Sequence, residues 1–232
     1  MCIRDRHNYK ELVKRALDLV QEAIKISGKN CQIAGSFPPI NVSFRPDLTG
    51  TQSELEDFYG SLGEIYKDNV DIIMCESMSS IFEGRNASRV AKEFSERVWL
   101  SWTNRGHQPD QLPSTEALSK AVDFSIEADV ECTLINCSHA DMASNSIKEL
   151  KRASRFGIFA NSSTFKEVDL SIATKDVDAI HHLNSEKISA NEYAMIALSW
   201  VKEGAFVVGG CCGTTVEHTS CLLYTSPSPR DS

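Results

Sequence analysis

Three cysteines in this chain have the residue type and spacing expected of a metal centre. Cys211 and Cys212 are adjacent, and they directly follow the apolar run Ala205 to Val208 and two glycines. A third cysteine, Cys137, follows another apolar run far upstream, Leu134 to Asn136. Three thiolates from two strand ends would leave the fourth position of a tetrahedral zinc ion open, which is the arrangement of a catalytic site rather than a closed structural one.

Adjacent cysteines can bind one ion only where a strand has ended. Within a strand, consecutive side chains point to opposite faces of the sheet, so Cys211 and Cys212 could not both reach it. Glycine lacks a Cβ and lets the backbone turn, and Gly209, Gly210 and Gly213 flank the pair. The sequence therefore predicts that a strand ends close to the two cysteines.

Two other interpretations of these residues compete with metal binding. A buried cysteine can act as a small apolar side chain, which suits the isolated Cys31, Cys75 and Cys132 but explains poorly a pair enclosed by glycines. His139 and His218 each lie near a proposed ligand and are the competing candidates. Because three thiolates and a substrate already fill a tetrahedron, we expect both histidines to lie at the surface or around the ligands.

These motifs resemble the homocysteine S-methyltransferase family, which also supplies the homocysteine module of cobalamin-dependent methionine synthase. The strongest likeness is the stretch Gly204 to His218, and the pair Asn136-Cys137 matches the family's middle zinc-ligand motif. Weaker agreement lies in four short stretches: Ala34 to Ser36, Ile72 to Ser77, Trp99 to Thr103 and Phe159 to Ser162. The resemblance covers roughly residues 10 to 219.

The resemblance implies a zinc-dependent enzyme with an α/β fold, a TIM-type barrel of eight parallel strands each followed by a helix. It implies that Cys137, Cys211 and Cys212 bind Zn²⁺ and that Glu76 holds the amino group of homocysteine. The expected reaction moves a methyl group from a sulfonium or quaternary-ammonium donor to the thiol of homocysteine, forming methionine. Because the metal activates that thiol, no further catalytic residue is expected.

Polar residues at other strand ends are candidates for substrate contacts. Glu76 ends an apolar run, where a carboxylate could meet a substrate ammonium or could only cap the next helix. Asn136 could bind substrate, orient the metal ligands or satisfy the local backbone. Thr103 and Asn161 could contact substrate or belong to ordinary loops. Further upstream, Phe37 could pack on a cationic methyl donor or belong to a rigid turn on the rim.

Short apolar runs alternate with longer amphipathic segments, which is typical of βα units that build a parallel sheet. We predict six strands, at residues 32–35, 70–75, 98–102, 132–136, 157–160 and 205–209. Matching them to the family assigns them to the third through eighth strands of an incomplete barrel. Helices should begin at Thr51, Ser80 and Ser189, each followed three residues later by a glutamate. An N-terminal helix has a face formed by Leu12, Leu19 and neighbouring apolar residues.

Both ends of the chain look foreign to any fold. One oligonucleotide can encode residues 1–6 in one direction and residues 221–225 in the other, and residues 226–232 read like its continuation. We expect residues 1–6 and 221–232 to derive from a sequencing adapter, and residues 7–220 to form a partial barrel domain without its first two strands. On this interpretation the parent protein is the methyltransferase, and the chain alone is inactive or nearly so.

Composition and net charge argue against some classes of function for this chain. With 41% hydrophobic and 24% charged residues, the chain has ordinary globular composition and suits one domain. A net charge of -8 without a basic stripe argues against nucleic-acid binding, and no apolar run is long enough to span a membrane. The sparse cysteines fit a reducing cytoplasm. The sequence does not choose the methyl donor or the oligomeric state.

Two functions of other classes are the alternatives. The chain could be the homocysteine-binding module of a larger cobalamin-dependent methionine synthase. It could also be a noncatalytic thiol or metal sensor that uses Cys211 and Cys212 as a redox pair.

Overall fold

The computed structural model describes residues 9–106, 108–164 and 186–225. Its centre is a sheet of six parallel strands in the order β1-β2-β3-β4-β5-β8. These strands are β1 (Ala34–Phe37), β2 (Ile72–Met78), β3 (Val98–Trp102), β4 (Cys132–His139), β5 (Phe156–Asn161) and β8 (Val207–Gly210). All six predicted strands are confirmed, with ends shifted by at most three residues. A short antiparallel pair, β6 (Ser163–Thr164) and β7 (Glu186–Lys187), was not predicted.

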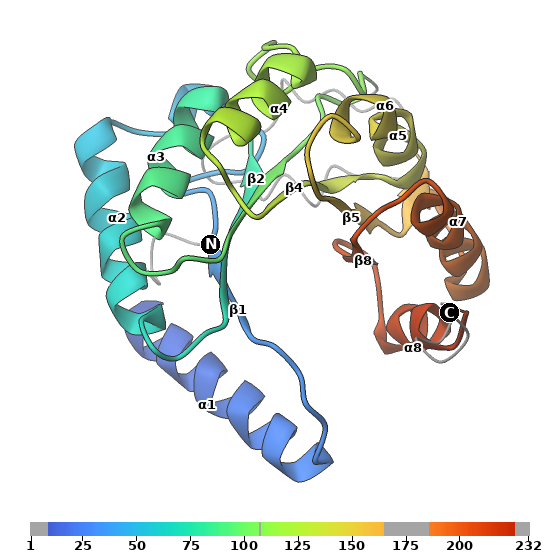
Figure 1. Ribbon diagram of the computed structural model, residues 1–232, viewed down its shortest axis with the longest axis horizontal. Helices are drawn as coiled ribbons and strands as arrows, with labels where there is room; N and C mark the ends of the chain where they lie inside the picture. Colours follow the sequence, from blue (N-terminus) through green and yellow to red (C-terminus); the bar gives the residue numbers. More distant parts are fainter. Residues whose placement is uncertain (1–8, 107, 165–185, 226–232) are drawn as a thin grey trace.

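Helices cover the outer side of this sheet. They are α1 (Tyr9–Ser27), α2 (Gln52–Tyr66), α3 (Ile81–Ala91), α4 (Leu118–Glu127), α5 (Ala140–Asn145), α6 (Ile147–Leu150), α7 (Ala190–Lys202) and α8 (Val216–Thr225), with a 3-10 turn at Pro46–Leu48. In Figure 1 the strands form the inner layer of an open arc, with β1 and β8 at its two ends. Because these two strands do not pair within the described chain, the architecture is a half-barrel.

Helix starts follow the predicted capping pattern. Thr51 caps α2 and Ser189 caps α7. In each case the side-chain oxygen accepts a hydrogen bond from the backbone N–H of the glutamate three residues on, and the carboxylate of that glutamate accepts one from the backbone N–H of the cap residue. Ser80 caps α3 in the same way, but the Glu83 carboxylate accepts from the backbone N–H and hydroxyl of Ser79 instead. These caps satisfy N–H groups that would otherwise lack partners at the first turn.

Alternation along the strands divides the apolar side chains between two faces. An inner cluster faces the hollow of the arc and consists of Ile72, Met74, Trp99, Cys132 and Leu134, with Phe159 and Val207 packed against it. Their strand neighbours face the helices and form the larger cluster, which includes Trp102 on β3 and Trp200 on α7, both fully buried. The sheet therefore has a helix-covered face and an inner face on which a site can be built.

The predicted apolar face of the N-terminal helix exists but is exposed. Leu12, Leu19 and Val20 of α1 are 58%, 49% and 43% exposed, whereas Val13 and Leu17 pack against the core. The apolar residues of α1 lie on one side of the helix. The edge of that side that carries Tyr9, Val13 and Leu17 packs on the core, whereas the edge that carries Leu12 and Leu19 is exposed.

The structure also bears on two other expectations, which concern the role of Phe37 and the two ends of the chain. Phe37 is fully buried and stacks on Tyr59 with ring centroids 4.9 Å apart, so it belongs to the core rather than to a donor site. Residues 1–6 and 226–232 lie outside the described residues, whereas 221–225 continue α8. No described helix has the length and apolar character that crossing a bilayer requires.

Candidate metal centre

Polar side chains occupy the inner face at the carboxyl ends of the strands, above the inner apolar cluster. They are Ser36 on β1, Glu76 on β2, Ser101 on β3, Asn136 on β4 and Asn161 on β5, and Cys211 follows β8 directly. On β2 to β5, each of these residues lies two positions after an apolar residue of the inner cluster, so alternation places it on the same face. This end of a parallel barrel is where active sites are built.

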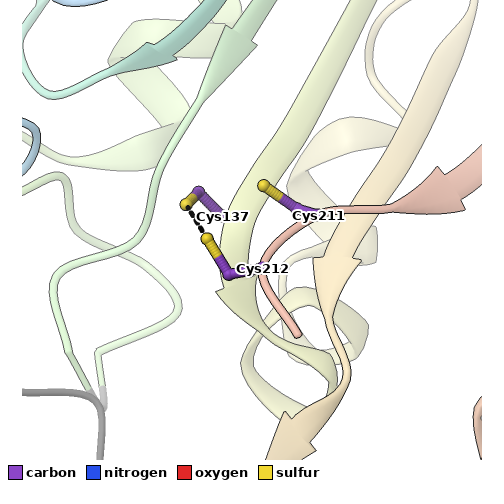
Figure 2. Close-up of side chains that lie close together, drawn as sticks. All are labelled: Cys137, Cys211 and Cys212. Carbon is purple, nitrogen blue, oxygen red and sulfur yellow. Dashed lines mark hydrogen bonds between the residues drawn. The ribbon is translucent and has the colours of Figure 1, made fainter. Parts of the chain in front are cut away.

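Three cysteine sulfurs converge at this rim. The Sγ atoms of Cys137, Cys211 and Cys212 all lie within 4.8 Å of one another, and those of Cys137 and Cys212 are 3.5 Å apart. Figure 2 shows the three side chains pointing toward one another. In a tetrahedral site with Zn–S bonds of about 2.3 Å, the sulfurs are about 3.8 Å apart. The donor set therefore fits zinc after shifts of about 1 Å or less.

Cys137 reaches this cluster because its backbone is left-handed, with φ of 53°. Leu134 faces inward and Ile135 faces the helices, so Asn136 faces inward and regular alternation would turn Cys137 outward. The left-handed residue breaks that alternation, and the β4–β5 register shifts between Asn136 and His139. Sequence reasoning missed this device because no glycine marks the position.

The adjacent cysteines lie beyond the last strand, as predicted, since β8 ends at Gly210. The glycines differ in their roles. A Cβ on Gly210 would lie 2.4 Å from the hydroxyl oxygen of Thr214, so this position needs close approach. Gly213 has φ of 78° and supplies the turn. Gly210 thus lets the returning chain pack on the strand, Gly209 leaves room for the ring of Phe159 on β5, and Gly213 redirects the chain.

Hydrogen bonds from β5 and α7 hold the cysteine loop in place. The Cys212 N–H donates to Oδ1 of Asn161 (3.1 Å), and the Cys211 N–H donates to the carbonyl of Ala160 (2.9 Å). The Tyr193 hydroxyl lies 2.8 Å and 2.7 Å from the carbonyl oxygens of Ala160 and Gly209, and its single proton can be donated to either. The end of β8 is therefore fixed to β5 beside Cys137.

The electrostatics of the cluster keep the thiols of Cys137 and Cys211 protonated without a cation. Hydrogen bonds with Cys211 and Cys212, followed by burial, raise the pKa of Cys137 well above its usual range. For Cys211 the hydrogen bond with Cys137 lowers the pKa, but the contact with Cys212 and burial outweigh it and raise the pKa to about 11. Three thiolates so close together require a positive ion.

Glu76 is a partly buried carboxylate on the same rim. Its Oε1 accepts a hydrogen bond from the Ser36 hydroxyl. Burial raises the pKa of Glu76, the Ser36 bond partly offsets that effect, and negative charge on Cys211 raises it further. None of the ion pairs within the described residues involves Glu76. It is therefore suited to receive a cationic group from a ligand.

The other predicted residues lie around the cluster in different ways. Asn136 is 1% exposed and hydrogen-bonds to Ser77 and Ser101. Thr103 is fully buried, with Oγ1 3.5 Å from the carbonyl oxygen of Cys137. The partners Ser36, Ser77 and Ser101 were not singled out from the sequence, although a serine near each strand end was the available signal.

The two candidate histidines lie outside the cysteine cluster, which is the one metal-ligand group found among the described residues. Nδ1 of His139 is 2.9 Å from the Ser163 hydroxyl. Nδ1 of His218 is 2.9 Å from the Thr215 hydroxyl, and its Nε2 is 3.3 Å from the carbonyl of Ile188. The ring of His139 is thus held by β6, and the ring of His218 by the chain at Thr215 and Ile188.

Comparison with known proteins supports this reading of the fold. The chain is similar to the crystal structures of the homocysteine methyltransferase MmuM from Escherichia coli. The metallated form superposes with a TM-score of 0.73 and 19% identity over 94% of this chain and 71% of MmuM, and the apo form with 0.70 and 18% over 95% and 75%. These likenesses confirm the predicted TIM-type barrel fold, of which the described residues form six parallel strands.

Comparison of the sequence with known proteins identifies the family of this chain. The chain is 23% identical over 188 residues to homocysteine S-methyltransferase YbgG of Bacillus subtilis (strain 168), a match covering 79% of this chain. It spans 56% of the length of that relative. The family model of homocysteine S-methyltransferases matches residues 2–223. The chain therefore belongs to the homocysteine S-methyltransferase family.

Proposed function

We propose that the protein represented by this chain transfers a methyl group to the thiol of homocysteine, forming methionine, with zinc held by Cys137, Cys211 and Cys212. The observation that carries the proposal is the convergence of three sulfurs, all within 4.8 Å of one another, at the carboxyl ends of β4 and β8. Three protein ligands leave one tetrahedral position for a substrate sulfur.

The chain's own residues account for most of the proposed chemistry. Zn²⁺, when bound, supplies the positive charge that keeps a thiol of ordinary pKa, roughly 8.5, in its thiolate form at neutral pH. The three cysteines would hold the ion at a rim that β5 and α7 fix in place. The raised pKa values of Cys137 and Cys211 mean that these two thiols lose their protons on metal binding rather than before it.

Glu76 is the proposed partner of the substrate's amino group. Its carboxylate lies on the same rim as the cysteines, near enough for the charge on Cys211 to raise its pKa. An incoming ammonium would lower the pKa of Glu76 and be held by a charge-assisted hydrogen bond. An amino acid with a thiol side chain could thus contact Glu76 with one end and the metal centre with the other.

Thr103, Asn136 and Asn161 stay candidates for substrate contact. In this structure Asn161 accepts from the backbone of Cys212, and Thr103 lies beside the carbonyl of Cys137. These contacts support an indirect role, in which both side chains hold the metal-binding loops.

The proposed transfer step needs positioning more than acid–base catalysis. The substrate sulfur forms a bond to the methyl carbon, and the bond from that carbon to the donor's sulfur or nitrogen breaks. Its electron pair stays with the donor, which leaves uncharged. Because the thiol proton is already lost, no general base is required, and the protein's task is in-line alignment of donor and acceptor.

The test begins with the purified chain under reducing conditions. We expect one zinc per chain, and we expect homocysteine to change the absorption spectrum of the cobalt-substituted protein because its sulfur joins the metal. A screen of sulfonium and quaternary-ammonium donors with the full-length gene product then identifies the methyl source. A cobalt spectrum that homocysteine leaves unchanged would contradict the proposal.

The same measurements separate the two alternatives. A module of a cobalamin-dependent enzyme would bind homocysteine at the metal but use none of the free donors. A thiol sensor would show no thiol coordination. In the structure the short sulfur contact joins Cys137 to Cys212 rather than the adjacent pair, which does not favour Cys211 and Cys212 as a redox couple.

A further inference from the structure

Asn136 connects three strands through one buried amide. Its Oδ1 accepts from the backbone N–H of Ser77 on β2 (2.8 Å) and from the hydroxyl of Ser101 on β3 (2.6 Å). Its Nδ2 donates to the hydroxyl of Ser77 (2.8 Å). An asparagine side chain offers two acceptor sites and two donors, so three of its four hydrogen-bonding sites are used, and the residue is 1% exposed.

The residues at both ends of this connection have left-handed backbones. Ser77 has φ of 59° and Cys137, the residue after Asn136, has φ of 53°. Neither is glycine, so both conformations are unfavourable unless neighbouring groups impose them. The strand register shifts at the same two places, between Cys75 and Met78 on β2 and just after Asn136 on β4.

Each left-handed residue turns a side chain toward the inner face of the sheet. On β2, Ile72 and Met74 belong to the inner cluster, whereas Ile73 and Cys75 face the helices. Alternation would therefore turn Ser77 outward, yet its hydroxyl meets Asn136 on the inner side. Cys137 is reoriented in the same way toward Cys212.

We propose that Asn136 is a positioning residue for the metal centre: by joining the left-handed end of β2 to the end of β4, it holds the Cys137 sulfur in line with Cys211 and Cys212. This inference rests on the proposed metal function and adds a residue that acts through a ligand. Three of the four hydrogen-bonding sites of the side chain are used by Ser77 and Ser101, so the positioning role does not depend on contact with substrate. Without it, the Cys137 backbone can relax toward the extended form, which turns its sulfur away.

The experiment is a cobalt titration of the purified chain and of single-site variants. Cobalt bound by thiolates absorbs through sulfur-to-metal charge transfer, so the spectrum reports both affinity and the number of sulfur ligands. Residues that support metal ligands typically change affinity 10- to 100-fold when removed. We expect Asn136→Ala to weaken cobalt binding by roughly that factor, with a spectrum approaching that of Cys137→Ala.

A matched control removes a buried hydrogen bond on the opposite face of β3. Ser125 on α4 is 1% exposed and accepts from the indole N–H of Trp102 at 3.0 Å. We expect Ser125→Ala to lower the thermal unfolding midpoint but to keep the cobalt affinity and the three-thiolate spectrum. A role of Asn136 in stability alone would make the two alanine variants alike in cobalt binding.

A milder variant decides the question if Asn136→Ala does not fold. Ser101→Ala removes one donor to the Asn136 side chain and keeps both contacts with Ser77. We expect it to weaken cobalt binding several-fold, in contrast to Ser125→Ala. Equal affinities for Ser101→Ala and Ser125→Ala would overturn the inference. Failure of the unsubstituted chain to bind cobalt would overturn the metal site itself and the inference with it, so the two failures are distinct.

Discussion

At the scale of single residues, Cys211 and Cys132 are a matched pair of cysteines with opposite expected roles. Cys211 lies in the sulfur cluster, whereas Cys132 is 1% exposed within the inner apolar cluster. We expect Cys211→Ala to weaken zinc binding by at least about 100-fold, because the loss of a metal ligand weakens binding more than the loss of a residue that only supports a ligand. Cys132→Ala should keep the zinc and cost about 1 kcal/mol of unfolding free energy.

Zinc content by elemental analysis and affinity by competition with a chromophoric chelator measure the first effect. Thermal or urea unfolding measures the second. If Cys211→Ala retained zinc with the affinity of the unsubstituted chain, the assignment of the ligands would be wrong.

Glu76→Gln tests the contact proposed for the substrate's amino group. Glutamine keeps the shape and the Ser36 contact but lacks the negative charge, so the charge-assisted hydrogen bond is lost. Such bonds are worth about 1.5–3 kcal/mol, which corresponds to roughly a 10- to 100-fold weaker binding of homocysteine. Titration of the cobalt protein with homocysteine measures this.

The zinc affinity of Glu76→Gln serves as its control and should be unchanged. If Glu76→Gln bound homocysteine as tightly as the unsubstituted chain does, the amino group of the substrate would have to contact another residue.

At the scale of elements, two helix glycines with different surroundings give opposite predictions. A Cβ on Gly60, inside α2, would meet nothing within 4 Å, whereas a Cβ on Gly84, inside α3, would lie 2.5 Å from the buried ring of Trp102. Gly60→Ala should stabilise the chain by up to about 1 kcal/mol, since alanine favours helix. Gly84→Ala should destabilise it by about 1–3 kcal/mol through overpacking. Urea unfolding compares the two, and equal effects would contradict the close packing of α3 on β3.

A charge cluster joins the amino ends of β3, β4 and β5. Glu131 accepts from Arg97 (3.0 and 3.1 Å), from the indole of Trp99 (3.0 Å) and from Arg155 (3.1 Å). The bond with Arg97 is the largest cause of the lowered pKa of Glu131, and the bond with Trp99 and the charge of Arg155 add to it. A carboxylate with a lowered pKa stabilises the fold above its unfolded pKa of about 4.3.

That contribution is lost as the pH falls through the folded pKa of Glu131. We expect Glu131→Gln to be less stable than the unsubstituted chain by about 1 kcal/mol at pH 7. The difference should shrink as the pH falls below the folded pKa of Glu131, where the native carboxylate is protonated. Unfolding curves at several pH values measure it, and a difference independent of pH would show that the charge is not responsible.

The elements were largely predictable because their signals are local. The capping serine and threonine residues of α2, α3 and α7 lie three positions from their glutamates, and each strand is a short apolar run. The β6–β7 pair was not predicted, because two-residue strands carry no period. The orientation of α1 was not predictable either, because it depends on which helices and strands happen to pack beside it.

At the scale of the whole molecule, the half-barrel leaves apolar surface and strand edges uncovered. Within the described chain β1 and β8 each pair on one side only, and Leu12, Leu19 and Val20 of α1 are exposed. Unpaired edges and exposed apolar patches favour association between molecules. The purified chain should therefore associate increasingly as its concentration rises.

Leu19→Lys should reduce that association and change the unfolding free energy by no more than about 0.5 kcal/mol, since the side chain is half exposed. Light scattering over a concentration series measures the effect. Met195→Lys on α7, where Met195 is 63% exposed, is the control and should have a smaller effect. If both lysine variants reduced association equally, net charge rather than the α1 face would be responsible.

The sequence by itself determined the residue types of the site and the order of the elements. Cysteines between glycines, apolar runs and capping pairs act through neighbours along the chain, so they can be recognised without the fold. Tertiary structure alone decided that Cys137 turns inward, that Asn136 is committed to Ser77 and Ser101, and that α1 exposes its apolar face. These features depend on contacts between residues distant in sequence, whose energies outweigh local backbone preferences only once the strands lie side by side.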